Sequence, residues 1–266
     1  MRKGAASPDA APANLKLKGS SHEKKLIAVW GSPNSGKTTF ATKLAQTIYE
    51  RYQSTVIVLY ADNETPALPV VFPNYKKEDM FSVGAVLAKT EILQEDVIRQ
   101  LVTIKQKQNF GFFGFTDGEN KYTYPTFDET KVRSLFAVLS TLADFVIVDC
   151  TSNLKNPISK VAIKEADDVI RLATPDLKSV SFYSSQLPLY ADPVFRLDQH
   201  IQGINVSDAD LYMPIEEAKS RLHDPRFVIP YSRAVKEQML DGKLTEPVND
   251  RKFNEKFKAI VDKIVG

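Results

Sequence analysis

The chain has 266 residues, 43% of them hydrophobic and 26% charged, enough for one large or two small domains with a hydrophobic core. Its 35 Lys and Arg against 33 Asp and Glu give a charge of +2, which excludes a histone-like polycation and a strongly acidic tail. The single cysteine, Cys150, excludes an intramolecular disulfide and a thiolate metal cluster. No apolar run approaches the roughly 18 to 20 residues that cross a bilayer, so we expect a cytoplasmic protein, with peripheral membrane contact as an alternative.

The N-terminal segment, residues 1–22, consists mainly of Ala, Pro, Ser, Gly and Lys. Leu15 and Leu17 are its only large apolar side chains, too few to offset the entropy lost on ordering. We therefore predict a flexible tail. No obvious linker follows it, and residues 23–266 are predicted to form one domain.

The predicted ordered part begins with Leu26–Trp30, a continuous apolar run typical of a strand buried on both faces. After a glycine-containing loop, apolar residues at spacings of three and four predict a helix that ends near Tyr52. Val56–Leu59 predicts a second strand, which completes a βαβ unit with parallel strands. The fold class is therefore α/β, with a mostly parallel central sheet and helices on both faces.

The rest of the chain continues this alternation. Further strands are predicted at four apolar runs bounded by turn residues: Phe145–Val148, Val169–Leu172, Ile201–Val206 and Phe227–Ile229. Periodic segments predict helices over Glu95–Lys105, Glu129–Leu142 and Pro214–Leu222. The segment Asn109–Phe127 fits neither period. Its clustered aromatic residues indicate an insertion or an edge hairpin that fills the core, or alternatively a surface that stacks bases or grips a partner.

Residues Gly31–Thr38 match the phosphate-binding pattern G-x-x-x-x-G-K-[ST] and lie between the first predicted strand and helix, where such a loop belongs. Backbone N–H groups of the loop and the helix N-terminus would face the phosphates. Lys37 can reach the β- and γ-phosphates, Thr38 can ligate Mg²⁺, and Thr39 can contact the α-phosphate. The predicted nucleotide-binding residues here are Gly31, Ser32, Asn34, Ser35, Gly36, Lys37, Thr38 and Thr39.

Two carboxylates follow predicted strands. Asp149 ends the most apolar run of the chain and is predicted to hold Mg²⁺ through water, the alternative being a residue that caps the next loop. Asp62 ends the second strand and is either a Mg²⁺ ligand or water-orienting group, or a turn-forming residue. Lys37, Asp62 and Asp149 are the candidate catalytic residues. Cys150 is interpreted as a small buried residue rather than a nucleophile.

In this order and at these spacings, the elements resemble the ParA/MinD superfamily of P-loop ATPases, whose fold is of the deviant-Walker, or SIMIBI, type. The resemblance continues through Ala166–Asp176 and through the segment from Pro230 to Gly242. The ending is most similar to the TadZ/CpaE branch, which localises pilus assembly machinery. The resemblance implies ATP or ADP and Mg²⁺ as cofactors and a homodimer that closes on ATP. It also implies that Asn205 contacts adenine, although a turn residue is the alternative, and that Pro230 and Tyr231 supply backbone contacts.

The chain departs from the superfamily at two positions. A signature lysine that reaches across the dimer corresponds to Ser32, and the first acid of a D-x-D pair corresponds to Tyr60. Loss of that cation weakens stabilisation of the transition state, and loss of the acid weakens positioning of water. ATP binding is therefore better supported than rapid hydrolysis.

The function predicted from the sequence is a slow ATPase that works as a nucleotide-switched dimer and localises a cellular machine such as pilus assembly, with a protein partner. ParA-like partitioning, an ATP-binding scaffold without useful hydrolysis, and a P-loop small-molecule kinase are the alternatives. The charge of +2 predicts weak nucleic-acid binding or none. A final helix is predicted from Phe253 to Ile264, packed on its own sheet or, alternatively, lying on an anionic membrane.

Overall fold

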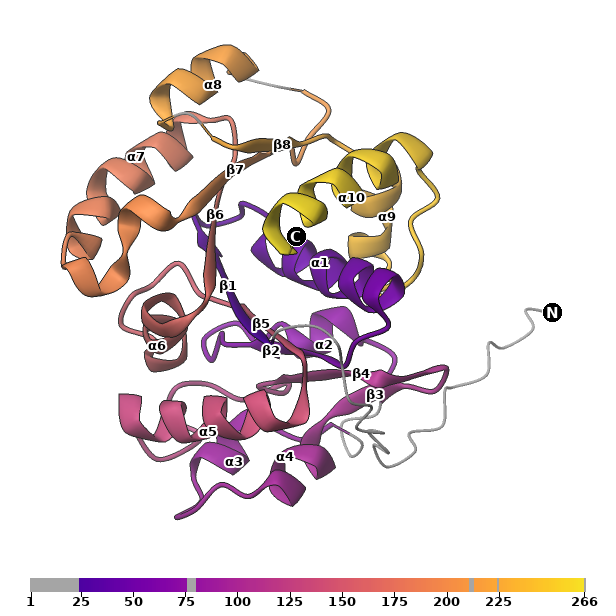
Figure 1. Ribbon diagram of the computed structural model, residues 1–266, viewed down its shortest axis with the longest axis vertical. Coiled ribbons are helices and arrows are strands. Elements are labelled where there is room, and N and C mark those ends of the chain that lie inside the picture. The colour runs from indigo at the N-terminus through magenta and orange to yellow at the C-terminus, as the bar shows by residue number, and fades with distance from the viewer. Residues whose placement is uncertain (1–23, 76–79, 211–212, 224, 266) are drawn as a thin grey trace.

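The computed structural model describes residues 24–75, 80–210, 213–223 and 225–265 (Figure 1). The predicted tail, residues 1–22, lies outside these described residues. Eight strands form one sheet in the order β3-β4-β2-β5-β1-β6-β7-β8, and all neighbouring pairs are parallel except β3 and β4. The strands are β1 Lys25–Gly31, β2 Val56–Tyr60, β3 Val102–Ile104, β4 Lys107–Gly114, β5 Phe145–Asp149, β6 Asp168–Ala173, β7 Ile201–Asn205 and β8 Phe227–Ile229.

Helices cover both faces of this sheet (Figure 1). The helices are α1 Lys37–Tyr52, α2 Leu68–Val71, α3 Val83–Leu87, α4 Gln94–Gln100, α5 Glu129–Leu142, α6 Pro157–Glu165, α7 Leu177–Gln186, α8 Ile215–Arg221, α9 Arg233–Leu240 and α10 Arg251–Val265. Three short 3-10 helices follow α7: η2 Leu187–Tyr190, η3 Pro193–Phe195 and η4 Leu197–Gln199. These observations confirm the predicted α/β class with a mostly parallel sheet.

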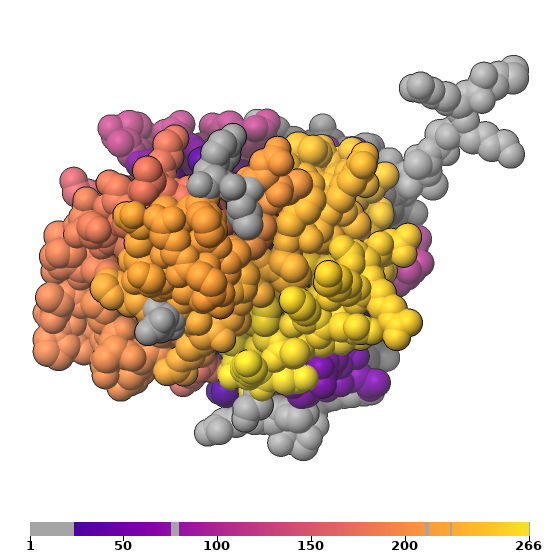
Figure 2. Space-filling view, turned by 90° about the horizontal axis from the view of Figure 1, so that it is seen from above, coloured from indigo at the N-terminus to yellow at the C-terminus, as the bar shows by residue number. Residues whose placement is uncertain are grey.

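Side chains of β1 alternate between two hydrophobic clusters, as the period of two in a strand requires. Ala28 and Trp30 join the cluster under α3 to α8, which we call the α5 face. Ile27 and Val29 join the cluster under α1, α2, α9 and α10, which we call the α1 face. Figure 2 is seen from the side of the molecule where β8, the last strand of the sheet, lies. There α8, in orange, covers the α5 face, and α9 and α10, in yellow, cover the α1 face. Because β1 is buried on both faces, its carboxyl end holds the following loop rigidly.

The final helix, α10, packs on its own sheet, which confirms the preferred of its two interpretations. It buries five apolar side chains, Phe253, Phe257, Ile260, Val261 and Ile264. The Phe257 ring lies edge-on to Phe40 of α1 at 5.5 Å between centroids. The apolar face is thus occupied within the fold. None of the helices among the described residues is long and apolar enough to cross a membrane.

Two sequence predictions need correction. The helix predicted over Glu95–Lys105 ends at Gln100, and Val102–Ile104 forms β3 instead. The segment Asn109–Phe127 is not an insertion, because β4 lies inside the sheet between β3 and β2. Part of the segment, in β4, does belong to an antiparallel hairpin at the sheet edge, but its partner β3 precedes the segment. Core filling is confirmed for the phenylalanines, since Phe110, Phe112, Phe113 and Phe115 are buried.

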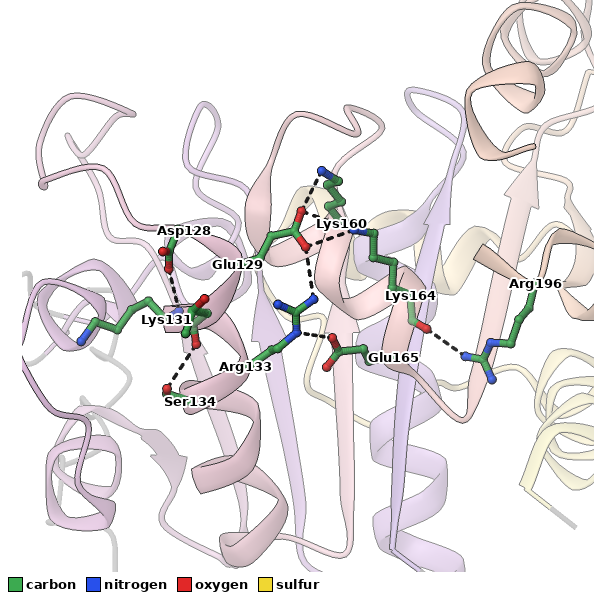
Figure 3. Close-up of polar contacts among 10 residues, drawn as sticks. Asp128, Glu129, Lys131, Arg133, Ser134, Lys160, Lys164, Glu165 and Arg196 are labelled. Carbon is green, nitrogen blue, oxygen red and sulfur yellow. Dashed lines mark hydrogen bonds and ion pairs between the residues drawn. The ribbon is translucent and has the colours of Figure 1, made fainter. Parts of the chain in front are cut away.

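Helices α5 and α6 are joined on the outside of the α5 face by a cluster of charges (Figure 3). Glu129 accepts from Lys160 at 2.7 Å and from Lys164 at 3.1 Å, and Arg133 pairs with both Glu129 and Glu165. Hydrogen bonds from the two lysines lower the pKa of Glu129 to about 2. The cluster links the two helices that pack beside β5.

Candidate nucleotide-binding site

The loop between β1 and α1 is a tight turn that depends on two glycines. A Cβ on Gly31 would overlap the backbone carbonyl of Leu172 in β6, because the two strands approach closely there. Gly36, at the N-cap of α1, has φ +81°, in the left-handed region that favours glycine. Asn34 is also left-handed, at φ 60°. Together these residues curl the backbone over the N-terminus of α1, the geometry that receives phosphate in other proteins.

Asn205, the last residue of β7, supports this loop from beside it. Its Nδ2 donates to the Ser35 carbonyl at 2.9 Å, and a Cβ on Gly36 would overlap the same amide group. The structure therefore places Asn205 at the cleft, with its amide nitrogen already committed to the loop backbone.

Lys37 lies within the loop rather than in solvent. Its Nζ donates to the Ser32 carbonyl and to Ser152 Oγ, each at 3.0 Å, and Ser152 Oγ donates in turn to the Gly31 carbonyl at 2.7 Å. Burial lowers the pKa of Lys37, and the nearby Asp149 opposes this shift. Both direct partners of Nζ are uncharged, so a phosphate would be a stronger partner than either. Ser152, in the loop after β5, is a residue that the sequence patterns did not single out.

Asp149 ends β5, directly beside β1, and is 5% exposed. Thr38 Oγ1 donates to its Oδ2 at 2.6 Å, while the buried Oδ1 has no hydrogen-bond partner. Burial raises the pKa of Asp149 to about 6. An orphaned carboxylate oxygen beside a threonine hydroxyl is a donor set that suits Mg²⁺, which takes one or two carboxylates and completes its shell with water and phosphate. Among the described residues no group of three or more acidic, His or Cys side chains could hold a metal alone.

Asp62 follows β2 and lines the same cleft. Its Oδ1 accepts from the backbone N–H groups of Glu64 and Thr65, each at 2.8 Å, which is the turn-forming geometry of an aspartate. The side chain remains partly exposed. Asp62 therefore forms the turn through Oδ1. Its other oxygen, Oδ2, is available to bind a metal ion or orient water.

The two positions at which the chain departs from the ParA/MinD pattern both face the interior. Ser32 is 1% exposed, its Oγ lies 2.7 Å from Ser179 Oγ, and its backbone N–H donates to the Leu172 carbonyl. The structure thus does not bring the predicted contact Ser32 into the cleft. Tyr60 is buried on the α1 face, where its hydroxyl lies 2.9 Å from Thr42 Oγ1.

The loop opens into a cleft of about 1310 Å³ at the carboxyl ends of the parallel strands. Ten predicted site residues line it: Asn34, Gly36, Lys37, Thr38, Thr39, Asp62, Asp149, Asn205, Pro230 and Tyr231. Gly31, Ser32 and Ser35 also belong to the loop, but they are buried and do not line the cleft. Lys121 and Lys155 also line the cleft, although neither belongs to a recognisable motif. The cleft is at least as large as the usual ligand pocket and has room for a nucleotide.

Comparison with solved structures agrees with this architecture. A ParA family ATPase from Chlorobium tepidum is similar over 91% of this chain and 98% of its own, with TM-score 0.69 and 14% identity. MinD of Pyrococcus horikoshii with Mg-ADP covers 89% and 94%, with TM-score 0.65 and 19% identity. A complex of a Cyanothece McdA variant with ATP covers 91% and 96%, with TM-score 0.64 and 18% identity. No family model and no curated protein matches the sequence. At these identities the likeness shows the fold, which is that of the ParA and MinD ATPases.

Proposed function

We propose that the chain is a Mg-ATP-binding protein of the ParA/MinD type that hydrolyses ATP slowly and acts as a nucleotide-switched dimer through one domain, residues 23–266. The observation that carries the proposal is the convergence of Lys37, Thr38 and an unpaired Asp149 oxygen at the mouth of a left-handed glycine loop. A buried carboxylate oxygen without a partner is costly, and a cation bound with a polyphosphate would remove that cost.

In this proposal Thr38 and Asp149 hold the magnesium, which neutralises phosphate charge when bound. Lys37 exchanges its two neutral partners for phosphate oxygens, and the loop N–H groups cradle the chain of phosphates. Pro230 and Tyr231 lie at the side of the cleft formed after β8 and would contact the base or ribose.

Slow turnover follows from what the loop lacks. Ser32 occupies the place of the signature lysine and is buried against Ser179, so it contributes no charge to the γ-phosphate. A positioned cation such as an arginine finger accounts for about three to five orders of magnitude in such reactions. An ATP-binding scaffold is therefore the second candidate, and both make the same prediction for binding.

Phosphate release under saturating Mg-ATP tests the proposal. We expect slow release that Lys37→Ala abolishes together with nucleotide binding, because no other side chain of the loop supplies a cation. Lys258→Ala, an exposed lysine of α10, is the matched control and should leave both unchanged. Binding without release above the Lys37→Ala background would support the scaffold instead, and ADP formation that requires an added small acceptor would support a kinase. Absence of nucleotide binding would refute all three.

The proposal also includes the cellular machine that the switch positions. On the similarity of its closing segment to TadZ and CpaE, we propose that the switch positions pilus assembly machinery. ParA-like partitioning is the alternative, and one of the similar structures is described as a putative plasmid partition protein from Borrelia burgdorferi. Deletion of the gene separates them, since loss of surface pili supports the first and loss of plasmids or chromosomes from daughter cells supports the second.

A further inference from the structure

A second cavity, of about 640 Å³, lies on the α5 face and is separate from the nucleotide cleft. Its walls come from β6, from the segment that contains η2, η3 and η4, and from His223, which follows α8. Two arginines line it, Arg171 from β6 and Arg196 from between η3 and η4. Nothing in the proposed ATPase function uses either of them.

Arg171 is a buried cation without a counter-ion. It lies in the middle of β6, paired in register with Trp30 of β1 and Gln202 of β7, and is 7% exposed. Its Nε is buried and has no hydrogen-bond partner. Among the described residues no carboxylate forms an ion pair with it, and its guanidinium lies over the Tyr183 ring, with Cζ 5.5 Å from the ring centroid. An unpaired buried charge is among the most expensive features a core can carry.

The rings packed near Arg171 are uncharged. Trp30 stacks on Tyr190 at 4.4 Å between ring centroids, and its Nε1 donates to His200 Nδ1 at 3.3 Å. With Nδ1 as the acceptor, His200 Nε2 donates to the Phe195 carbonyl at 2.8 Å. Burial, with Arg171 and Arg196 nearby, lowers the pKa of His200 to about 4, so this ring is uncharged at neutral pH.

Arg196 is fixed at the rim of the same cavity. Its Nη2 donates to the Ala166 carbonyl at 2.5 Å and to the Lys164 carbonyl at 3.3 Å, the second of which is drawn in Figure 3. Two acids, Asp192 and Asp198, also line the cavity. Asp192 Oδ1 accepts from the backbone of Val194, and neither Asp192 nor Asp198 forms an ion pair with an arginine.

We propose that this cavity binds a small oxyanion, a carboxylate or phosphate group, between Arg171 and Arg196. Guanidinium groups pair with such oxyanions through charge-assisted hydrogen bonds. The Arg171 side chain lines the cavity and forms no ion pair, so its guanidinium can supply donors of this kind to an occupant. The site also adjoins the phosphate-binding loop. Leu172, the next residue after Arg171, accepts from Ser32 N–H and from Tyr183 Oη at 2.6 Å. An occupant would therefore contact Arg171, the neighbour in sequence of the residue whose carbonyl holds the loop.

NMR of protein labelled with ¹⁵N-arginine tests the proposal on the unaltered chain. Mg²⁺ and a non-hydrolysable ATP analogue are added first to fill the main cleft, and inorganic phosphate or succinate is then titrated against chloride at equal ionic strength. We expect the Nε–H resonance of Arg171, assigned by its loss in Arg171→Lys, to shift saturably with one or both oxyanions. An unsaturable shift equal to that with chloride would overturn the site. The readout is at Arg171 itself, so it stands whether or not the nucleotide binds.

Variants supply the second arm. Arg171→Met and Arg196→Gln should each raise the dissociation constant of the titrated oxyanion at least about tenfold, whereas Arg99→Met, an exposed arginine of α4, should not. If Arg171→Met fails to fold, the dissociation constant in Arg196→Gln and the Arg171 resonance of the unaltered protein still test the proposal. An unchanged dissociation constant in Arg196→Gln would refute the proposal, and so would the absence of a saturable shift at Arg171 in the unaltered protein. Saturation by phosphate alone or by succinate alone would identify the ligand chemistry.

Discussion

Asp149 lies in an environment that conflicts with its charge. It is buried, one of its oxygens has no partner, and its pKa is raised to about 6. Because the pKa in the folded protein lies above the unfolded value, the native state holds the proton more tightly. The penalty for ionising Asp149 is therefore absent at pH values below the unfolded pKa, grows up to about pH 6 and is complete above it.

Asp149→Asn should consequently stabilise the empty protein at pH 8 by about 1 to 3 kcal/mol, since asparagine can still accept from Thr38. The gain should shrink as the pH falls from 6 towards 4. The same change should weaken Mg-ATP binding at least about tenfold, because the proposed magnesium ligand loses its charge. Urea unfolding at pH 8 and pH 5, with calorimetry for binding, measures both. Asp117→Asn, at an exposed position outside the cleft, is the control. An Asp149→Asn protein less stable than the parent at pH 8 would contradict the argument.

Residues of the loop could be predicted from sequence because their roles follow from adjacent residues. The spacing of Gly36, Lys37 and Thr38 already places them at the N-terminus of a helix. Ser32 was different, since its burial depends on Ser179, which lies 147 residues away in the chain. The unpaired state of Arg171 depends in the same way on segments that approach it only in the fold, and no sequence pattern reports that.

At the scale of elements, the loop depends on how closely β1 approaches β6. Gly31 ends β1 against the Leu172 carbonyl, with no room for a Cβ. Any side chain there would push the two strands apart at the point where Ser32 N–H bonds to the same carbonyl.

Gly31→Ala should therefore lower the free energy of unfolding by at least about 2 kcal/mol and weaken nucleotide binding even in protein that remains folded. Gly111→Ala is the matched control in β4, where a Cβ would meet only the flexible end of Leu101, at 3.3 Å. Denaturant unfolding and nucleotide titration of both variants measure the difference. Equal stability of the two alanine proteins would show that the approach of β1 to β6 does not restrict this position.

Elements with a single strong period were predictable, and those stabilised by their neighbours were not. Glu129–Leu142 was predicted with the bounds of α5, since its apolar period is uninterrupted. The predicted helix Glu95–Lys105 failed in its second half because Val102–Ile104 finds a partner in β4. β4 itself places three phenylalanines in the core and has glycines on its path, a pattern that periodicity alone could not assign.

For the whole molecule, the rim of the nucleotide cleft is the surface that a switch would use. Val70 is 49% exposed and Met239 47% exposed, and both line the cleft although they come from distant parts of the chain, α2 and α9. Apolar side chains at the mouth of a nucleotide site are suited to a partner that closes over it. In the proposed dimer that partner is a second copy.

Addition of Mg²⁺ and a non-hydrolysable ATP analogue should double the mass measured by light scattering, because the nucleotide supplies the contacts that the empty cleft lacks. Met239→Glu combined with Val70→Glu should prevent doubling yet leave nucleotide binding within about threefold, since neither side chain belongs to the loop. Leu189→Glu, an exposed apolar residue of η2 outside the cleft, should leave doubling intact. Doubling that survives the paired change would place the interface elsewhere, and a mass that never doubles with bound nucleotide would reduce the proposed switch to a monomeric one.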